Sequence, residues 1–463
     1  MRANKFANFV LIGGILLFGM ILAYALYKYT YYDPQKHIFV FTVISFVGML
    51  ICLLALKLRQ DYKINLVLMS LSIVFVVYLV EIVLFFVSPP LYERERVHLQ
   101  LAQKMGMSFD TRTKQEVIDD LKKRSVDAVP FVYPSLHVSS NGLEIEGQRI
   151  FPLGGISQKT TVLCNENGEW AIYESDEHGF NNPTGLFEEG IDLLFVGDSF
   201  AHGDCVKQGE SIVGKMRRMS GMRVISLGSG ASGPLIEFAS LKEYGQPLKP
   251  KYVLWMYSEG TDQWDFKQEQ QSPLLLKYRD SQFSQHLISR QSEIDSLLSQ
   301  DVQKKSEKKR QEQKTIHIRQ LFKIVRLLHL RHKFKPSIPP WTTPSAPSAQ
   351  TWLLFTELLE KAQNFTSSWG GQLYFVYVPT WARYAYAKDV EPASFHHRNR
   401  VLSIVKELNI PIIDIHEKVF AVHSDPMSLY PFRVKGHYTN EGNHLVAQAI
   451  HAYLKEESLS TEP

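Results

Sequence analysis

Cysteine is scarce in this chain, with only Cys52, Cys164 and Cys205 among 463 residues. No two of them have the Cys-x-x-Cys spacing typical of zinc and redox sites, and three are too few for a disulfide-rich scaffold. The histidines show no metal-binding pattern either, because His396 and His397 are neighbours and cannot both face one ion from a helix. We therefore expect neither a metal nor another cofactor.

A strong charge of either sign is also missing. The formal net charge is +4 at pH 7 and no nucleic-acid-binding motif is present, so nucleic acid is not an expected partner. The hydrophobic content of 45% conceals an asymmetry, because the first 90 residues are strongly apolar and the remainder is not. A chain of 463 residues is also too long for one ordinary core, which indicates two or three units.

Three apolar runs lie in the first 90 residues, at 9–26, 38–56 and 64–87. Each is long enough to cross the ~30 Å hydrocarbon layer of a bilayer, which takes about 20 helical residues. The first run is too long for the core of a signal peptide and no small-residue cleavage site follows it. We therefore predict three transmembrane helices in residues 1–90, with membrane lipid as their partner.

Basic residues predict the orientation of these helices. Arg2 and Lys5 precede the first run, and three more basic residues occupy the short loop between the second and third runs. The positive-inside rule places both segments in the cytoplasm. The remainder of the chain is then expected on the far side, which in a bacterium is the periplasmic or outer face of a multi-pass inner-membrane protein.

The exported part falls into two sections. Residues 91–176 are predicted to form a helical connector followed by short decorating strands. From residue 190 onward, apolar strand patterns alternate with amphipathic helical patterns; the strands are expected at 192–196, 223–227, 252–257, 373–378 and 410–413. This alternation is typical of an α/β fold with a parallel sheet covered on both faces. Ligand sites in such sheets lie at the carboxyl ends of the strands.

One stretch interrupts the alternation. Residues 270–335 are highly charged and helix-prone, and the proline-rich segment 336–347 follows them. We expect a helical insertion at about 270–348. It could form a lid or bind a partner, although a charged helix is more often a solvated face.

The clearest chemical signal is Gly197-Asp198-Ser199, directly after the first expected strand of the sheet. A tight strand-to-helix turn exposes a serine hydroxyl and directs backbone N–H groups toward a developing oxyanion. A serine nucleophile needs a base, and His437 precedes the last amphipathic helix. We therefore predict Ser199 as the nucleophile and His437 as its base.

These residues resemble the SGNH/GDSL hydrolase family. Gly197-Asp198-Ser199 matches its first block, and His437 with the following Asn440 and Gly442 matches its last. The segment from Asp176 to Asn182 is similar to the membrane-linked bacterial branch, which is often associated with envelope polysaccharides. The resemblance implies a hydrolase-like domain over residues 177–456, with a five-stranded parallel sheet of flavodoxin-like order.

The resemblance also implies an oxyanion hole and an orienting acid. The oxyanion donors would be the backbone of Ser199, the backbone of Ala231, which aligns with a family glycine, and the hydroxyl of Thr261, which replaces a family asparagine. The family usually has an aspartate three residues before the histidine, but here that position is Val434.

Three outcomes follow from the substitution at Val434. A backbone carbonyl could orient His437 in a Ser–His dyad, or another acid could replace the missing one; Asp262 and Asp425 are the candidates, with Asp198 as a further supporting residue. Alternatively, the domain has lost catalysis and only binds a ligand.

Cys164 and Cys205 are both expected outside the cytoplasm, where an oxidising compartment permits disulfides. They could pair and tie the decorating strands to the turn that carries Ser199, or they could remain two half-buried thiols.

These observations predict an SGNH-type serine esterase or O-acyltransferase acting on an ester of an envelope glycan or exopolysaccharide. Because water and a sugar hydroxyl can resolve the same acyl-enzyme, the residues do not separate hydrolysis from transfer. The alternative is a non-catalytic glycan-binding or assembly subunit of a polysaccharide export system, which the replacements at Val434 and Thr261 motivate.

Overall fold

The computed structural model describes residues 2–31, 36–87, 93–188, 190–314, 324, 327, 330, 347–385 and 396–460. The chain divides into two compact units. The first combines residues 1–90 with 313–337, and the second combines residues 91–312 with 338–463. The connector and decorating strands therefore belong to the same unit as the sheet.

The described residues 2–87 of the first unit form three helices: α1 (Arg2–Tyr31), α2 (Lys36–Ala55) and α3 (Gln60–Val87). Two stretches of them, Arg2–Tyr27 and Gln60–Phe85, are long and apolar enough to cross a membrane, judged by length and composition. The middle expected span coincides with α2, but the apolar stretch of its described residues, Thr42–Ala55, is shorter than a span requires. The structure thus supports two of the three predicted transmembrane helices.

The second unit is built on a parallel sheet with all five predicted strands. They are β6 (Leu193–Gly197), β7 (Val224–Ser226), β8 (Tyr252–Ser258), β9 (Gln372–Val378) and β10 (Ile412–Asp414). Their order is β10-β9-β8-β6-β7, and every neighbouring pair is parallel. This is the flavodoxin-like order expected from the sequence, with its switch point at β6.

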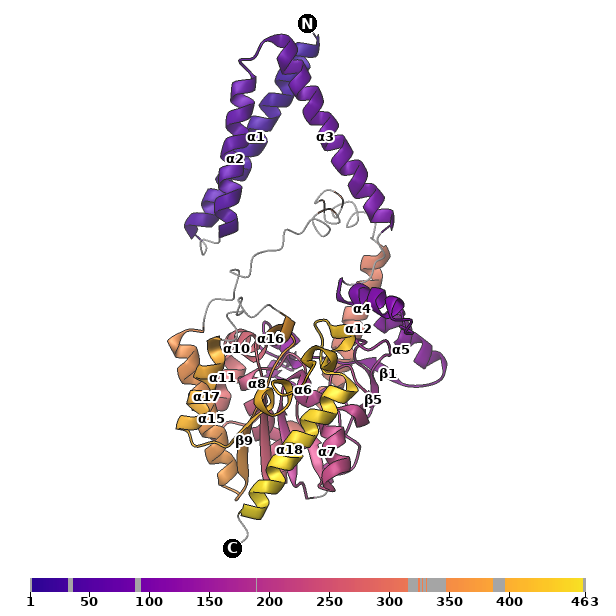
Figure 1. Cartoon of the computed structure of the whole chain (residues 1–463), viewed down its shortest axis with the longest axis vertical. Helices are drawn as coiled ribbons and strands as arrows, with labels where there is room; N and C mark the ends of the chain where they lie inside the picture. The colour runs from indigo at the N-terminus through magenta and orange to yellow at the C-terminus, as the bar shows by residue number, and fades with distance from the viewer. Residues whose placement is uncertain are drawn as a thin grey trace. The chain divides into compact units, whose positions relative to one another are not determined.

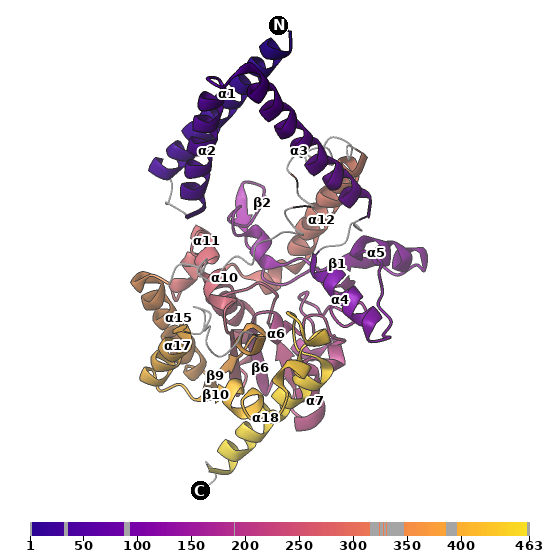
Figure 2. The ribbon, with the colours of Figure 1, turned by 45° about the horizontal axis from the view of Figure 1, so that its top comes forward.

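Helices cover both faces of the sheet, as Figure 1 shows. Alternate residues of each strand point to opposite faces, so Leu193 and Phe195 pack in one core and Leu194 and Val196 in the other. The first face is covered by α7 (Ile212–Ser220) and α18 (Asn440–Ser460). The second is covered by α8 (Pro234–Ser240), α15 (Ala349–Ser367) and α17 (His396–Glu407). In both views α15 and α17 lie side by side (Figures 1 and 2).

The segment before the sheet forms an accessory layer. Helices α4 (Glu93–Lys104) and α5 (Lys114–Lys123) precede a three-stranded sheet of β1 (Ala128–Pro130), β4 (Thr160–Val162) and β5 (Ile172–Glu174), and a hairpin of β2 (Leu143–Ile145) and β3 (Gln148–Ile150). Short helices complete the unit: α6 (Ser199–His202), α9 (Gln246–Leu248), α10 (Asp262–Glu269), α11 (Pro273–Leu276) and α16 (Ala382–Ala385). The loop between β4 and β5 becomes important below.

The predicted insertion is only partly a solvated arm. Helix α12 (Gln291–Lys314) buries Ile294 and Leu298, and Tyr278 and Leu287 before it are also buried in the main core. Its Asp295 accepts hydrogen bonds from the backbone and hydroxyl of Ser157 at 2.8 and 2.7 Å. The first part of the insertion therefore packs as part of the second unit. Most of the expected proline-rich segment, residues 336–346, lies outside the described residues.

Candidate active site

The turn that carries Ser199 is fixed by its neighbours. Gly197 has φ 151°, and a Cβ there would lie 2.7 Å from the carbonyl oxygen of Met256. The carboxylate of Asp198 accepts a hydrogen bond from the Phe200 N–H at 2.9 Å and so caps α6. Gly203 ends that helix with φ 84°. The sequence therefore places Ser199 at the first position of a short helix, at the carboxyl edge of the sheet.

His437 faces this serine. Its Nε2 lies 2.8 Å from Oγ of Ser199, and 238 residues separate the two along the chain. The imidazole also packs edge-on against the ring of Phe200, with ring centroids 5.4 Å apart. The structure thus brings together the two residues that the sequence predicts as nucleophile and base, at the distance proton transfer requires.

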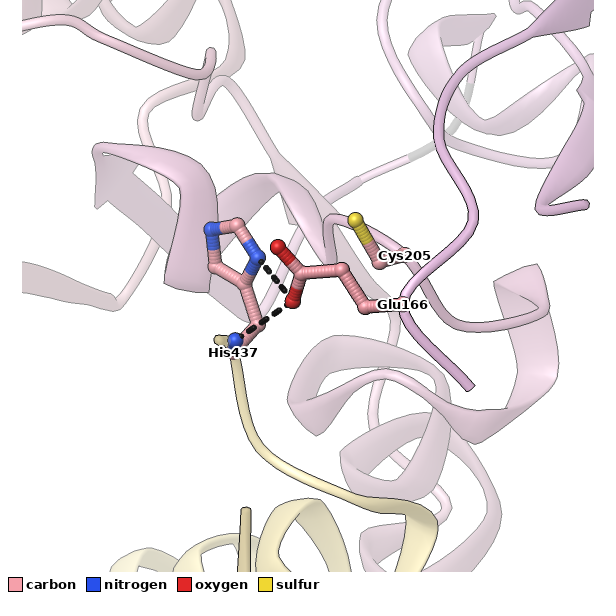
Figure 3. A group of neighbouring side chains, drawn as sticks. All are labelled: Glu166, Cys205 and His437. Atoms are coloured by element: carbon pink, nitrogen blue, oxygen red, sulfur yellow. Dashed lines mark hydrogen bonds and ion pairs between the residues drawn. The ribbon is translucent and has the colours of Figure 1, made fainter. Parts of the chain in front are cut away.

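The second ring nitrogen of His437, Nδ1, contacts Glu166, a residue that the sequence analysis does not single out. Oε2 of Glu166 lies 3.0 Å from Nδ1 of His437 and also accepts the His437 backbone N–H at 2.7 Å. Figure 3 shows the carboxylate turned toward this ring nitrogen. The Glu166 side chain is 4% exposed, and that of His437 is 20% exposed. Ser199, His437 and Glu166 therefore form a continuous hydrogen-bonded chain.

Glu166 lies in the loop between β4 and β5, and that loop is held firmly. The amide of Asn165 donates to the Asp110 carbonyl at 3.0 Å, and its side-chain oxygen accepts the Gly168 N–H at 2.9 Å. Two links join the loop to the segment after α6: a disulfide between Cys164 and Cys205, and a hydrogen bond of 2.9 Å from Asn167 to the Cys205 carbonyl. These links hold the loop of Glu166 against the segment that follows Ser199.

Of the three acids expected to support His437, Asp198 contributes to raising the pKa of the imidazole, whereas Asp262 and Asp425 are engaged elsewhere. Asp425 forms an exposed ion pair with Arg433, at 2.5 Å. Asp262 is fully buried and accepts the Ser258 N–H at 2.8 Å, and burial raises the pKa of its carboxyl well above the usual value. Because each is engaged in its own contacts, neither orients the imidazole. Glu166 takes the role that Val434 cannot fill, so the contact on Nδ1 is a carboxylate rather than a backbone carbonyl.

The expected oxyanion donors differ in their surroundings. Ala231 lies on an exposed turn after β7 with φ 56°, a left-handed conformation that suits the glycine of the family pattern. The hydroxyl of Thr261 lies 3.1 Å from Asp198 and 2.6 Å from Ser258. Since this hydroxyl has one proton, both side chains compete with a substrate oxyanion for it. The backbone N–H groups of Ser199 and Ala231 remain the stronger candidates.

Carboxylates around the site govern the protonation of His437. Burial alone would lower the pKa of this histidine, but the carboxylates of Glu166, Asp204 and Asp198 outweigh burial and raise it to about 9. Burial raises the pKa of Asp198 to about 6, despite the hydrogen bonds it receives from Phe200 and Thr261. The imidazole is therefore expected to carry a proton at neutral pH and to become a base as the pH rises.

The segment from Asp176 to Asn182 positions the site without touching the triad. The Asn181 amide donates to the His202 carbonyl at the end of α6, at 2.8 Å. The Asn182 side chain bonds both the N–H and the carbonyl of Ser226 in β7, at 2.8 and 2.9 Å. Asp176 in turn accepts a hydrogen bond of 2.7 Å from Asn182. This motif joins the accessory layer to the elements that carry Ser199 and Ala231.

Comparisons with known proteins give matches of structure only. No protein-family model matches the sequence. No curated protein matches it either. A putative lipolytic protein of the G-D-S-L family from Desulfitobacterium hafniense is 12% identical, with a TM-score of 0.32; the alignment covers 57% of this chain and 99% of that one. An acetyl xylan esterase is 11% identical, with a TM-score of 0.32, covering 57% of this chain and 100% of that one.

A third structure is a two-domain esterase active on acetylated mannans. It is 13% identical, with a TM-score of 0.31, and the alignment covers 60% of this chain and 52% of that one. The solved structures similar to this chain thus include a lipolytic protein of the G-D-S-L family. The sequence motifs of this chain resemble the same family.

Proposed function

We propose that this chain is a membrane-anchored serine ester hydrolase or O-acyltransferase that acts on an acyl ester of an envelope glycan. The observation that carries the proposal is the hydrogen-bonded chain from Ser199 through His437 to Glu166. Three residues in this order and at these distances are the constellation that activates a serine in unrelated hydrolase folds. The buried acid gives the imidazole its orientation and stabilises its charged form.

The reaction follows from the positions of the three side chains. Oγ of Ser199 attacks the acyl carbon while Nε2 of His437 takes its proton, and the Glu166 carboxylate stabilises the imidazolium. The imidazolium then gives this proton to the leaving sugar oxygen, and an acyl-serine remains. The neutral imidazole next removes a proton from water or from an acceptor hydroxyl, whose oxygen attacks the acyl-serine. The imidazolium then returns the proton to Oγ of Ser199 as the Oγ–acyl bond breaks, which releases the acid or the new ester and regenerates Ser199. Backbone N–H groups of Ser199 and Ala231 are the proposed oxyanion donors.

An exposed tryptophan supports a sugar substrate. Trp264 lies in the first turn of α10, three residues after Thr261, and is 53% exposed. Among the described residues from 93 to 460 it is the one large aromatic side chain exposed to this degree. The hydroxyl of Thr261 contacts Asp198 beside Ser199, and an exposed indole can stack on the apolar face of a pyranose ring. The two long apolar helices of the first unit support membrane anchoring, and the sequence's basic residues favour the periplasmic side for the second unit.

The proposal is tested with the full chain in detergent. Hydrolysis of p-nitrophenyl acetate and release of acetate from acetylated xylan are measured for the wild type, Ser199→Ala and the exposed control Ser281→Ala. We expect Ser199→Ala to abolish both activities and Ser281→Ala to retain them. If wild type and Ser199→Ala release product equally slowly, the chain is not a serine esterase, and the alternative of a glycan-binding assembly subunit is favoured.

A further inference from the structure

Three side chains at the site form a second constellation. A carboxylate oxygen of Glu166, Sγ of Cys205 and a ring nitrogen of His437 all lie within 4.8 Å of one another. Figure 3 shows the three side chains as neighbours. A thiolate, an imidazole and a carboxylate are the ligand types that bind zinc in proteins, and three protein ligands with one open position are typical of catalytic zinc sites. In the disulfide, however, Sγ of Cys205 is bonded to Cys164 and cannot bind a metal as a thiolate.

We propose that reduction of the Cys164–Cys205 disulfide converts Glu166, Cys205 and His437 into a site for a divalent transition metal such as Zn²⁺, and that metal bound there inhibits the enzyme. The inhibition rests on the proposed function, whereas the metal site does not. The disulfide then has a role beyond cross-linking, because it withholds the third ligand and keeps the catalytic histidine free of metal.

The three ligands are held together by contacts other than the disulfide. Asn167 donates a hydrogen bond of 2.9 Å to the Cys205 carbonyl, and the His437 N–H donates one of 2.7 Å to Glu166. Asn165 holds its loop through Asp110 and Gly168, at 3.0 and 2.9 Å. Opening the disulfide therefore removes one link between the two loops and leaves these hydrogen bonds in place.

Reduction of the Cys164–Cys205 disulfide requires a reductant and no oxidant. A dithiol or phosphine reductant supplies two electrons, the S–S bond breaks, and two protons from solvent complete the Cys164 and Cys205 thiols. Metal binding then displaces to solvent the Cys205 thiol proton and, from the imidazolium form of His437, its Nδ1 proton. In the active tautomer Nδ1 of His437 carries the proton and Nε2 accepts from Ser199.

A metal on Nδ1 reverses this arrangement. The ring proton then resides on Nε2, which donates to Ser199 instead of accepting from it. The metal also occupies the Glu166 carboxylate that orients the ring. Both effects remove the base, so a metal-bound protein should be inactive toward esters.

Substitution of the partner cysteine gives a direct test. Cys164→Ser leaves Cys205 as a free thiol without any reductant, and Cys164→Ser/Cys205→Ser is the matched control with the same opened loop. Both keep Cys52. Zn²⁺ affinity is measured by competition with a chromophoric chelator on untagged protein, and Co²⁺ is used to detect the thiolate-to-metal charge-transfer absorption. Esterase activity is followed in parallel with and without Zn²⁺.

We expect Cys164→Ser to bind one Zn²⁺ per chain, to show the cobalt–thiolate band, and to lose ester hydrolysis when Zn²⁺ is added. Losing a ligand should cost at least as much affinity as losing a residue that only orients one, so the double variant should bind about 10–100-fold more weakly. It should also lack the band and keep its activity in Zn²⁺.

Equal Zn²⁺ affinity in the two variants, or a missing cobalt–thiolate band in Cys164→Ser, would overturn the proposal. Activity of Cys164→Ser that persists with Zn²⁺ bound would overturn the inhibition. If Zn²⁺ binds through the thiolate but no metal-free variant or wild type hydrolyses esters, the metal site stands and the proposed function fails. Should Cys164→Ser not fold, wild-type protein treated with a phosphine reductant is compared with its untreated, oxidised form in the same Zn²⁺ and Co²⁺ titrations.

Discussion

Glu166 and His437 are 271 residues apart in the chain, yet Oε2 of Glu166 contacts both Nδ1 and the backbone nitrogen of His437. One carboxylate oxygen therefore orients the imidazole and also fixes the loop that carries it. Glu166 comes from the accessory layer, so this layer completes the proposed catalytic triad.

Substitution of the acid should impair catalysis with little change of shape. Glu166→Gln keeps the side-chain length but removes the charge that stabilises the imidazolium and favours its productive tautomer. We expect kcat on p-nitrophenyl acetate to fall about 10²–10⁴-fold, because general-base catalysis contributes this much. Asp425→Asn is the control and should retain activity, since Asp425 forms an exposed pair with Arg433. A larger loss of kcat in Asp425→Asn than in Glu166→Gln would show that Glu166 is not the acid that supports His437.

The pH dependence of catalysis should reflect the charge around His437. The neutral imidazole is the base, and neighbouring carboxylates raise its pKa to about 9, so kcat/KM should increase with pH toward a midpoint near that value. Glu166→Gln removes a main cause of the raised pKa and should move the midpoint to lower pH. The measurement is a pH profile of kcat/KM for wild type and variant. An unmoved midpoint in Glu166→Gln would contradict this electrostatic account.

The disulfide should contribute strongly to the stability of the second unit. Cys164 and Cys205 are separated by 41 residues, and closing a loop of that length stabilises a fold by about 4 kcal/mol in the chain-entropy treatment. Cys164→Ser/Cys205→Ser should therefore have a lower midpoint of chemical unfolding than wild type, monitored by tryptophan fluorescence of the full chain in detergent. Cys52→Ser is the matched control and should leave the midpoint near that of the wild type.

Trp264 should matter for glycan substrates and not for small esters. Trp264→Ala removes the exposed indole three residues after Thr261, so we expect kcat/KM on an acetylated polysaccharide to fall while hydrolysis of p-nitrophenyl acetate is retained. Leu353→Ala is the control, because Leu353 is 71% exposed on α15. Parallel loss on both substrates would indicate damage to the catalytic turn rather than loss of a sugar contact.

The parts of the fold and site that the sequence predicts are local patterns. Each of the five strands is a short apolar run, and Ser199 and His437 belong to short motifs beside a strand and a helix. Glu166 has no such pattern, because its place beside His437 is created by packing between the accessory layer and the sheet. The possible pairing of Cys164 with Cys205 is the one sequence feature that could have pointed to Glu166, because a disulfide there brings residue 166 near the segment after Ser199.

Two further features depend on tertiary contacts that the sequence does not show. The charge of the insertion suggested a solvated arm, but its scattered apolar residues, such as Leu287 and Ile294, are buried in the main core. Thr261 aligns with an oxyanion donor, yet Asp198 and Ser258 engage its hydroxyl. Composition and alignment do not reveal such competing partners, which depend on tertiary contacts.

The central claim is that Glu166 and His437 activate Ser199, and covalent labelling tests it most directly. The full chain is treated with a fluorophosphonate, and the modified peptide is located by mass spectrometry. We expect a single adduct on Ser199, no adduct in Ser199→Ala, and markedly slower labelling in Glu166→Gln than in Asp425→Asn. An adduct on another serine, or equal labelling rates in the two acid variants, would contradict it.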